Sequence, residues 1–491
     1  MKNPIKAAPK IKKFLLNNES TAQTIVKNTF WLSLSESVGR ALRIAIIIYA
    51  ARVLGAAGWG TFSYMASLAA VFTIFADIGI STVLVREVTK SPEAEAKYFS
   101  TTFTIKLALT LASFLFLVFV TPLFTGIPLS KPLLVSIGLL FVFDSFRRFG
   151  TSMFRAREKM EKEALINIFT QLIIVVGGFV ALFMRETPES LAAAYAFGAG
   201  VGLITAGYFL RDNLKQLFSG FDKTLVRSII KAAWPLSLAA IFGMLLVNID
   251  TVMIGWFREA EYVGYYSAAQ KPIALLYILP TLIVGGVFPP LARLARKNDL
   301  EFKRIFERAL GGITAVAFPI SIGIMLTSSE IVSFLYGDAY AAAAGPLRIL
   351  ALTVLTAFPI SIIVHGVFAY NEQKKLVPLW ASGAGLNIAL NLWLIPRLGI
   401  SGPAWASLVT QFIINGLIWR KMKRVNNFSI SNKLPAILLA TFMMSITAII
   451  GKLLDVHLFI IIAFAAAAYF ASLTFSGGSI IHELRGITKR A

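Results

Sequence analysis

The sequence predicts an all-α integral membrane protein with about 14 transmembrane helices, arranged as two six-helix lobes and two C-terminal helices. Of the 491 residues, 57% are hydrophobic and only 15% are charged, and the mean hydropathy is +0.74. An ordinary soluble domain of this length carries more charge and fewer apolar residues. The apolar residues also fall into runs of about 20, the length that an α-helix needs to cross a bilayer.

The predicted spans are the apolar runs of about 20 residues. In chain order they cover residues 30–53, 61–85, 101–123, 132–153, 163–184, 190–210, 230–256, 263–290, 309–335, 346–369, 376–395, 401–419, 434–451 and 456–474.

The positions of the basic residues explain the net charge of +22 and predict the orientation of the chain. Every second connection is rich in Lys and Arg, and the alternate connections contain few. The basic segments are 2–27, 86–97, 147–162, 211–231, 293–308, 374–375, 420–433 and 485–490. By the positive-inside rule these segments are cytoplasmic, which places both termini in the cytoplasm of a cell-membrane protein. The charge therefore needs no nucleic-acid partner.

Several function classes are excluded by what the sequence lacks. It contains no cysteine and only three scattered histidines, so it offers no thiol chemistry and no histidine spacing suited to a metal. It has no P-loop motif. No connection is large enough to hold the grouped acid and base of a glycosyltransferase or polymerase. We therefore expect neither an enzyme nor a cofactor.

The first predicted span contains charges that a membrane helix rarely keeps. In WLSLSESVGRALRIAIIIYAARVLG, residues 31–55, Glu36, Arg40 and Arg43 lie near the middle. A charge at the bilayer centre costs about 2.5 kcal/mol or more. Spacing by three or four places Ser33, Glu36, Arg40 and Arg43 on one helix face, opposite an isoleucine-rich face. This polar stripe must face protein or water. Alternatively, Arg40 or Arg43 pairs with Glu36 or Asp77 and only ties the first two helices together.

Asp77, Asp250 and Lys271 are further charges placed within predicted spans. Asp250 and Lys271 are candidates for one salt bridge, and each is equally a candidate for cation coupling or substrate binding. Asp77 is a candidate for titration or cation binding. Asp144 and Arg147 are expected to form a structural pair towards the cytoplasmic end of the fourth span.

Prolines are concentrated in one predicted helix, 263–290. They are Pro272, Pro280, Pro289 and Pro290, whereas the first two spans contain none. Because proline removes a helix hydrogen bond, this helix is the candidate flexing element, although a static kink has the same signature.

An internal repeat indicates the domain organisation. WLSLSESVG at 31–39 resembles WPLSLAAIFG at 234–243, and a second similarity, between 60–66 and 264–270, has the same offset of 204 residues. Six helices per repeat relate the two lobes about the membrane normal. The predicted parts are a basic N-terminal segment 1–27, a first lobe 28–211, an inter-lobe loop 212–228, a second lobe 229–424, and helices 13 and 14 with a cytoplasmic tail, 425–491.

Several motifs resemble those of the Wzx-type flippases of polysaccharides and lipid-linked oligosaccharides. Their superfamily also contains the multidrug and toxin extruders and the lipid II flippases. The motifs are NTFW (28–31), ARVLGAAGWGTFS (51–63), DIGISTVLVRE (77–87), VNIDTVMIG (247–255) and VGYYSAA (263–269). The resemblance implies two lobes around a central cavity that opens alternately to the two membrane faces. It also implies a polyprenyl-diphosphate-linked sugar as cargo.

The residues and the resemblance together give a hypothesis for the site. Arg40, Arg43 and Lys271 are expected to hold the anionic head group, because guanidinium and ammonium groups bind phosphate oxygens. Glu36, Asp77 and Asp250 are expected to form intramembrane ion pairs or to couple transport to an ion. Expected partners are the prenyl-linked sugar, membrane lipids, a coupling cation and polysaccharide assembly proteins. The alternatives are a lipid II flippase and a multidrug extruder, and the arginines argue against the extruder.

Overall fold

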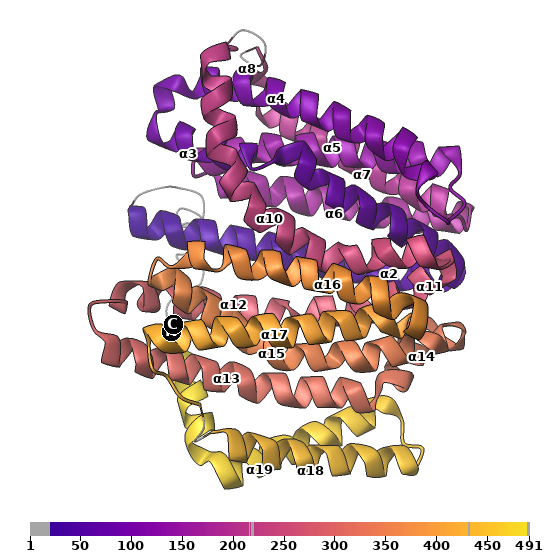
Figure 1. Ribbon diagram of the computed structural model, residues 1–491, viewed down its shortest axis with the longest axis vertical. Helices are drawn as coiled ribbons and strands as arrows, with labels where there is room; N and C mark the ends of the chain where they lie inside the picture. The colour runs from indigo at the N-terminus through magenta and orange to yellow at the C-terminus, as the bar shows by residue number, and fades with distance from the viewer. Residues whose placement is uncertain (1–19, 216, 218–219, 431–432, 489–491) are drawn as a thin grey trace, which may run out of the picture. The chain divides into compact units, whose positions relative to one another are not determined.

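The computed structural model describes residues 20–215, 217, 220–430 and 433–488, and in these residues it contains helices and connections but no β-strand (Figure 1). The predicted all-α membrane fold is thereby confirmed for this part of the chain. The α-helices are α2 (Thr21–Asp77), α3 (Ile80–Lys90), α4 (Glu95–Leu115), α5 (Lys131–Ala156), α6 (Met160–Met184), α7 (Pro188–Phe209), α8 (Arg211–Leu214), α10 (Lys223–Phe257), α11 (Ala260–Leu276), α12 (Ile278–Leu294), α13 (Asp299–Leu326), α14 (Ser328–Tyr336), α15 (Ala344–Ala369), α16 (Val377–Leu398), α17 (Ser401–Val425), α18 (Leu434–Leu453) and α19 (Leu458–Thr488). Most of the predicted segment 1–27 lies outside the described residues.

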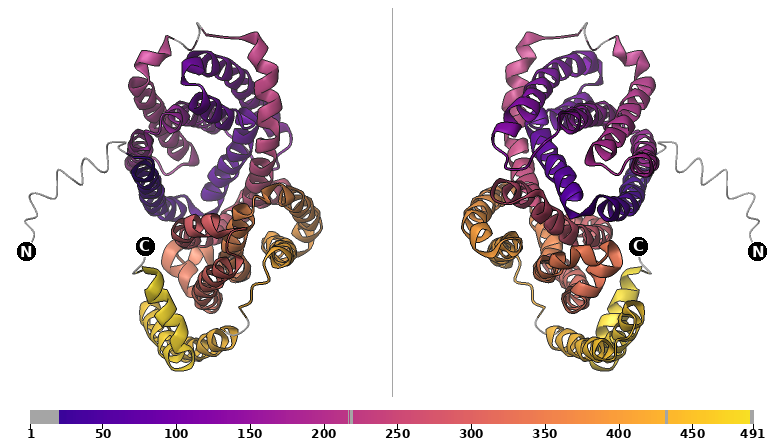
Figure 2. Two further views of the ribbon diagram at one scale, coloured as in Figure 1. Left: turned by 90° about the vertical axis from the view of Figure 1, so that its left-hand side faces the viewer. Right: turned by 90° about the vertical axis from the view of Figure 1, so that its right-hand side faces the viewer.

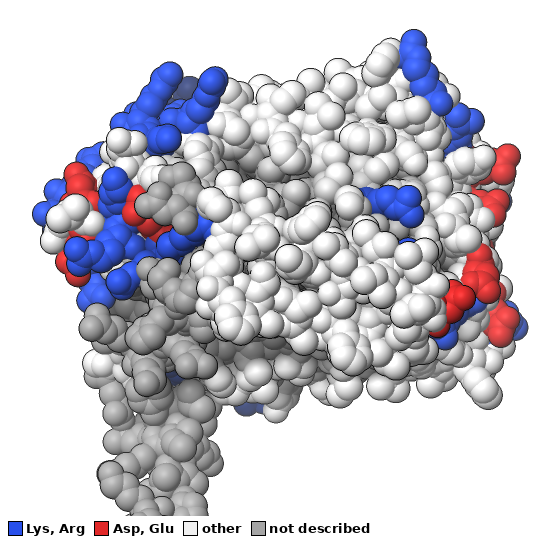
Figure 3. Space-filling model, turned by 90° about the horizontal axis from the view of Figure 1, so that it is seen from below, with Lys and Arg blue, Asp and Glu red and all other residues white. Residues whose placement is uncertain are grey.

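The distribution of charge on these helices suits a membrane. Among the described residues, nine helical stretches are long and apolar enough to cross a bilayer. Figure 3 shows one face of the molecule, where a broad central region is almost free of Lys, Arg, Asp and Glu and charged side chains gather at opposite edges. Each predicted span is mostly helical in the structure, and the first two fall on α2 and its continuation α3. The exact number of crossings stays a prediction.

The first two predicted spans are joined through a sharp bend in α2. Gly55, with φ 65° and ψ 177°, leaves the helical region there, and glycine tolerates this conformation because it has no Cβ. A second break at Ile78 and Gly79, both with positive φ, separates α2 from α3. Gly79 also packs against α10, since a Cβ at this position would lie 2.8 Å from the carbonyl oxygen of Ala233. Alanine is therefore disfavoured at Gly79 both by the positive φ and by the contact of its Cβ with Ala233.

The chain forms two compact units, Met1–Asn248 and Ile249–Ala491. In unit 1, α5 packs along α7, and α6 packs against both α2 and α7; Figure 2 views many of these helices nearly end-on. In unit 2, α15 packs against α13 and α17, and α17 also packs against α16. The unit boundary at Asn248 falls inside α10, after the predicted inter-lobe loop 212–228. The division into two six-helix lobes stays a prediction.

The two C-terminal helices are attached to unit 2 through a hydrophobic cluster. Helices α18 and α19 lie side by side, and both contact α13 (Figures 1 and 2). Ile437, Met444 and Ile461 are buried in this cluster, and the hydroxyl of Tyr469 donates a hydrogen bond of 2.6 Å to the carbonyl oxygen of Ala315. Burial of these side chains stabilises the attachment by the hydrophobic effect.

The proline-rich helix predicted at 263–290 is divided in two. Helix α11 ends at Leu276, and α12 begins at Ile278, with Tyr277 between them. Pro280 lacks the N–H that would bond to the carbonyl of Leu276, which accounts for the interruption at this point. The interruption lies between Pro272 and Pro280, within the segment that the prolines of the sequence indicate. That this helix flexes during transport stays a prediction.

The close approach of α6 and α7 gives a stability prediction. A Cβ added at Gly198 would lie 2.9 Å from the backbone nitrogen of Ile174, whereas one added at Gly207, in the same helix, would meet nothing within 4 Å. We expect Gly198→Ala to destabilise the folded protein by about 1–3 kcal/mol through overpacking. Gly207→Ala should be neutral or slightly stabilising, because alanine favours helix. Thermal unfolding of both variants in the same detergent checks this, and equal unfolding temperatures would contradict it.

Candidate functional site

The polar stripe of the first predicted span lies in the N-terminal half of α2. Arg40 Nε donates to Glu36 Oε2 at 3.2 Å, and Arg43 Nε donates to the carbonyl oxygen of Gly39 at 3.2 Å. The Arg43 side chain is half-buried, and α2 packs against α5, α6 and α7 of unit 1. The alternative of a structural pair describes Arg40 with Glu36, whereas the terminal nitrogens of Arg43 have no hydrogen-bond partner among the described residues.

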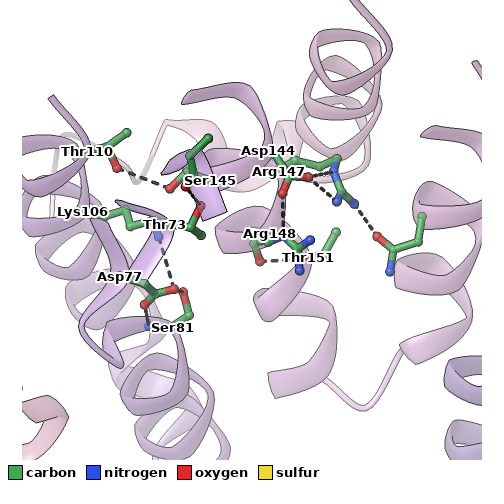
Figure 4. A network of polar contacts seen from close by, with 12 residues as sticks. Thr73, Asp77, Ser81, Lys106, Thr110, Asp144, Ser145, Arg147, Arg148 and Thr151 are labelled. Carbon is green, nitrogen blue, oxygen red and sulfur yellow. Dashed lines mark hydrogen bonds and ion pairs between the residues drawn. The ribbon is translucent and has the colours of Figure 1, made fainter. Parts of the chain in front are cut away.

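Helix α5, which packs against α2, carries two further arginines, Arg147 and Arg148 (Figure 4). Arg147 Nη2 and Arg148 Nε each donate to Asp144, both at 2.6 Å, and Arg147 Nη1 also donates to Asn167 on α6. The Arg147 side chain is 4% exposed, whereas that of Arg148 is 62% exposed. Arg147 thus holds α5 to α6, and Arg148 presents much of its guanidinium to its surroundings.

We call the residues Glu36, Arg40, Arg43, Asp144, Arg147 and Arg148 the arginine cluster. It contains four cations and two carboxylates, so it carries excess positive charge. An excess of guanidinium groups attracts anions and can form forked hydrogen bonds to phosphate. From the sequence, Asp144 lies near both Arg147 and Arg148, but only Arg147 is predicted as its structural partner; the structure pairs Asp144 with both. The available signal for Arg148 was its spacing, since Arg148 lies four residues after Asp144 on the same helix face.

Asp77 is held where α2 ends and α3 begins. Its carboxylate accepts hydrogen bonds from Ser81 N at 3.0 Å and Ser81 Oγ at 2.7 Å, and it forms a salt bridge of 3.2 Å with Lys106 of α4 (Figure 4). The Lys106 side chain is only 1% exposed. Lys106 was missed in the sequence analysis, although it lies inside the predicted span 101–123. The geometry gives Asp77 a structural task, to cap α3 and connect it to α4.

Asp250 lies in the interior of unit 2 and is 1% exposed. Its carboxylate accepts hydrogen bonds from Tyr266 Oη at 2.6 Å, Asn391 Nδ2 at 2.7 Å and Ser407 Oγ at 2.6 Å. These donors come from α11, α16 and α17 and are all neutral. Lys271, the partner considered in the sequence analysis, is not among the donors that the described residues supply to this carboxylate.

One donor to Asp250 also has an oxygen atom with unused hydrogen-bonding capacity. Asn391 Oδ1 is buried and has no hydrogen-bond partner within the described part of the chain. The carboxylate has hydrogen-bond donors but no cationic partner among the described residues, and burial of a charge without such a partner is costly. The described residues contain no group of three or more His, Asp or Glu side chains suited to a metal ion. A single carboxylate among neutral oxygens suits a monovalent charge.

Lys271 lies in α11 of unit 2, whereas Arg40 and Arg43 lie in unit 1. A joint role of these three residues in binding one ligand therefore stays a proposal.

Comparison with known proteins adds independent information. The family described as polysaccharide biosynthesis protein matches residues 25–295, more than half of the chain. A probable low-salt glycan biosynthesis flippase, Agl15 of Haloferax volcanii, is 22% identical over 395 residues, which cover 80% of this chain and 82% of that protein. A putative O-antigen transporter of Shigella flexneri is 24% identical over 331 residues, covering 65% and 78% of the two chains.

Solved structures share the fold. The lipid II flippase MurJ in an inward closed conformation has a TM-score of 0.74 at 18% identity, covering 91% of this chain and 99% of that chain. An inward-facing multidrug resistance transporter of the MATE family has a TM-score of 0.60 at 14% identity, covering 79% and 95%. At these identities the likeness concerns the fold alone. On the extent of the family match, this chain belongs to the family of polysaccharide biosynthesis proteins.

Proposed function

We propose that this protein is a flippase that moves a polyprenyl-diphosphate-linked oligosaccharide from the cytoplasmic to the outer leaflet by alternating access. The observation that carries the proposal is the arginine cluster, an excess of guanidinium groups among membrane helices. A diphosphate needs such fixed cations, because it must leave water to cross the bilayer. Family membership and relatives described as a glycan flippase and an O-antigen transporter support this function over catalysis.

In this proposal Arg43 and Arg148 bind the diphosphate directly. Within the described part of the chain, Arg43 donates only through its Nε, to Gly39, and Arg148 donates through its Nε to Asp144. The terminal nitrogens of both can therefore bind phosphate. Arg40 remains a further ligand, with Glu36 orienting it. Lys271 adds a point charge from unit 2. The prenyl tail stays in the lipid.

The cargo alternatives differ in charge. A multidrug extruder of organic cations needs acidic groups, and the excess of arginine in the cluster disfavours it. Lipid II carries the same diphosphate chemistry as an oligosaccharide carrier, so the cluster serves either cargo. Parallel transport assays with the two prenyl-linked substrates discriminate between them.

We further propose that Asp250 binds the coupling proton or monovalent cation. Its location in a neutral, buried set of oxygens allows the charge of the site to change with occupancy, which gives an ion gradient a means of driving the cycle. The charge distribution supports placement in the cell membrane with both termini in the cytoplasm. Proteins that assemble polysaccharide are the expected downstream partners.

Removal of the Arg43 charge tests the binding site. We expect Arg43→Gln to lower transport of a prenyl-diphosphate-linked sugar into proteoliposomes about tenfold or more, because a charge-assisted hydrogen bond is lost. Arg43→Lys should retain part of the activity, since it keeps the charge but loses the fork. Arg52→Gln, which removes an exposed charge from the same helix, is the matched control. Undiminished transport by Arg43→Gln at normal membrane levels would rule out this site.

Neutralisation of Asp250 tests coupling. We expect Asp250→Asn to transport cargo at a rate that no longer responds to an imposed sodium or proton gradient, because the variant has no carboxylate to bind either ion. Asp338→Asn removes an exposed carboxylate of unit 2 that accepts a hydrogen bond from Ser333, and it should keep the wild-type response. Transport is measured in proteoliposomes with one gradient at a time. A gradient response in Asp250→Asn equal to that of the wild type would refute the assignment.

A further inference from the structure

The start of α10 presents an unusual combination of unpaired cations and exposed apolar side chains. Lys223, Arg227 and Lys231 follow one another at intervals of four residues and so form a row about 12 Å long on one helix face. None of them forms an ion pair with a described residue. Some other basic residues near the connections do form salt bridges, such as Arg155 with Glu163 and Lys375 with Glu372.

The acidic residue nearest to this row in the sequence is already engaged. Asp222 accepts hydrogen bonds from Thr224 N at 2.9 Å and Thr224 Oγ1 at 2.6 Å, and these bonds lower the pKa of its carboxyl group. Asp222 therefore serves as a cap at the beginning of α10 rather than as a partner for the lysines. The row remains a local excess of positive charge.

Apolar side chains border the same row. Phe221, Ile230 and Trp234 are 48%, 41% and 54% exposed. Phe221 and Ile230 line an open groove of about 820 Å³ together with Val226 and the three cations, and the surface of this groove is mainly apolar. An apolar groove beside a row of cations is complementary to a molecule that has both an acyl chain and a phosphate.

The opposite face of this segment is fixed to unit 1. Ile229 and Ala233 are buried against Ile80 and Val83 of α3. Just before α10, the backbone nitrogen of Asp222 donates to Thr101 Oγ1 at 3.0 Å. The groove is therefore held in place by packing on one side and remains open on the other.

We propose that this groove binds an anionic phospholipid, with its phosphate against Lys223, Arg227 and Lys231 and an acyl chain along Phe221 and Ile230. Charge complementarity selects this occupant. The N-terminal residues 1–19 contain lysines but only one acidic residue, Glu19, and a second copy of a chain with net charge +22 would also be repelled. The proposal requires only that the chain lies in a membrane, and it does not depend on the cargo proposed above.

Retention of phospholipid by the purified full-length protein tests the proposal. Native mass spectrometry in detergent compares added phosphatidylglycerol with phosphatidylcholine. We expect the wild type to retain phosphatidylglycerol in preference to phosphatidylcholine. In the triple variant K223Q/R227Q/K231Q this preference should fall at least roughly tenfold. The matched control K297Q/R304Q/R308Q removes the same amount of charge from exposed positions on α13 and just before it. This control should keep most of the preference for phosphatidylglycerol.

Two further arms identify what the groove recognises. Ile230→Ser should weaken phosphatidylglycerol retention, and inorganic phosphate should not displace the lipid at equal concentration, because the acyl chain contributes to binding. Circular dichroism and gel filtration verify that each variant is folded. Equal loss of lipid in the control triple variant, or unchanged retention in K223Q/R227Q/K231Q, would overturn the proposal. Displacement by a prenyl diphosphate at much lower concentration than phosphatidylglycerol would also overturn it, since the groove would then belong to the cargo.

Discussion

A charged group among membrane helices must be paired, hydrogen-bonded or hydrated, because an isolated charge in a low-dielectric environment is costly. This constraint determines the interior of both units. Lys106 is almost completely buried and is compensated by Asp77, which also caps α3. Arg147 is likewise buried and is held by Asp144 and Asn167. The helices that carry these groups are fixed relative to one another as a consequence.

The two units satisfy the constraint in chemically different ways. In unit 1 the arginines outnumber the carboxylates of the cluster, so positive charge remains after the internal pairs have formed. In unit 2 the single carboxylate of Asp250 is surrounded by a tyrosine, an asparagine and a serine, all neutral. The first arrangement leaves fixed positive charge, whereas the second leaves a buried carboxylate that is held by neutral donors.

Helix breaks are placed beside these charged groups. Asp77 lies immediately before the positive-φ residues Ile78 and Gly79, and its carboxylate replaces backbone hydrogen bonds that the break removes. The interruption at Tyr277 depends on proline and lies in a helix that also carries Lys271. Polar side chains and irregular backbone therefore occur together, as expected where membrane helices line a polar site.

The sequence by itself determined the membrane class, the helical segments and the charges that needed an explanation, because apolar run length and the cost of buried charge are properties of the chain. It also located the bend of the proline-rich helix. Only the tertiary structure decided which side chains pair with these charges or donate hydrogen bonds to them. Lys106 and Arg148 are far from Asp77 and Arg43 in the sequence, and the neutral donors to Asp250 come from three separate helices. Periodicity shows which face of one helix is polar, but packing decides which side chains of other helices meet that face.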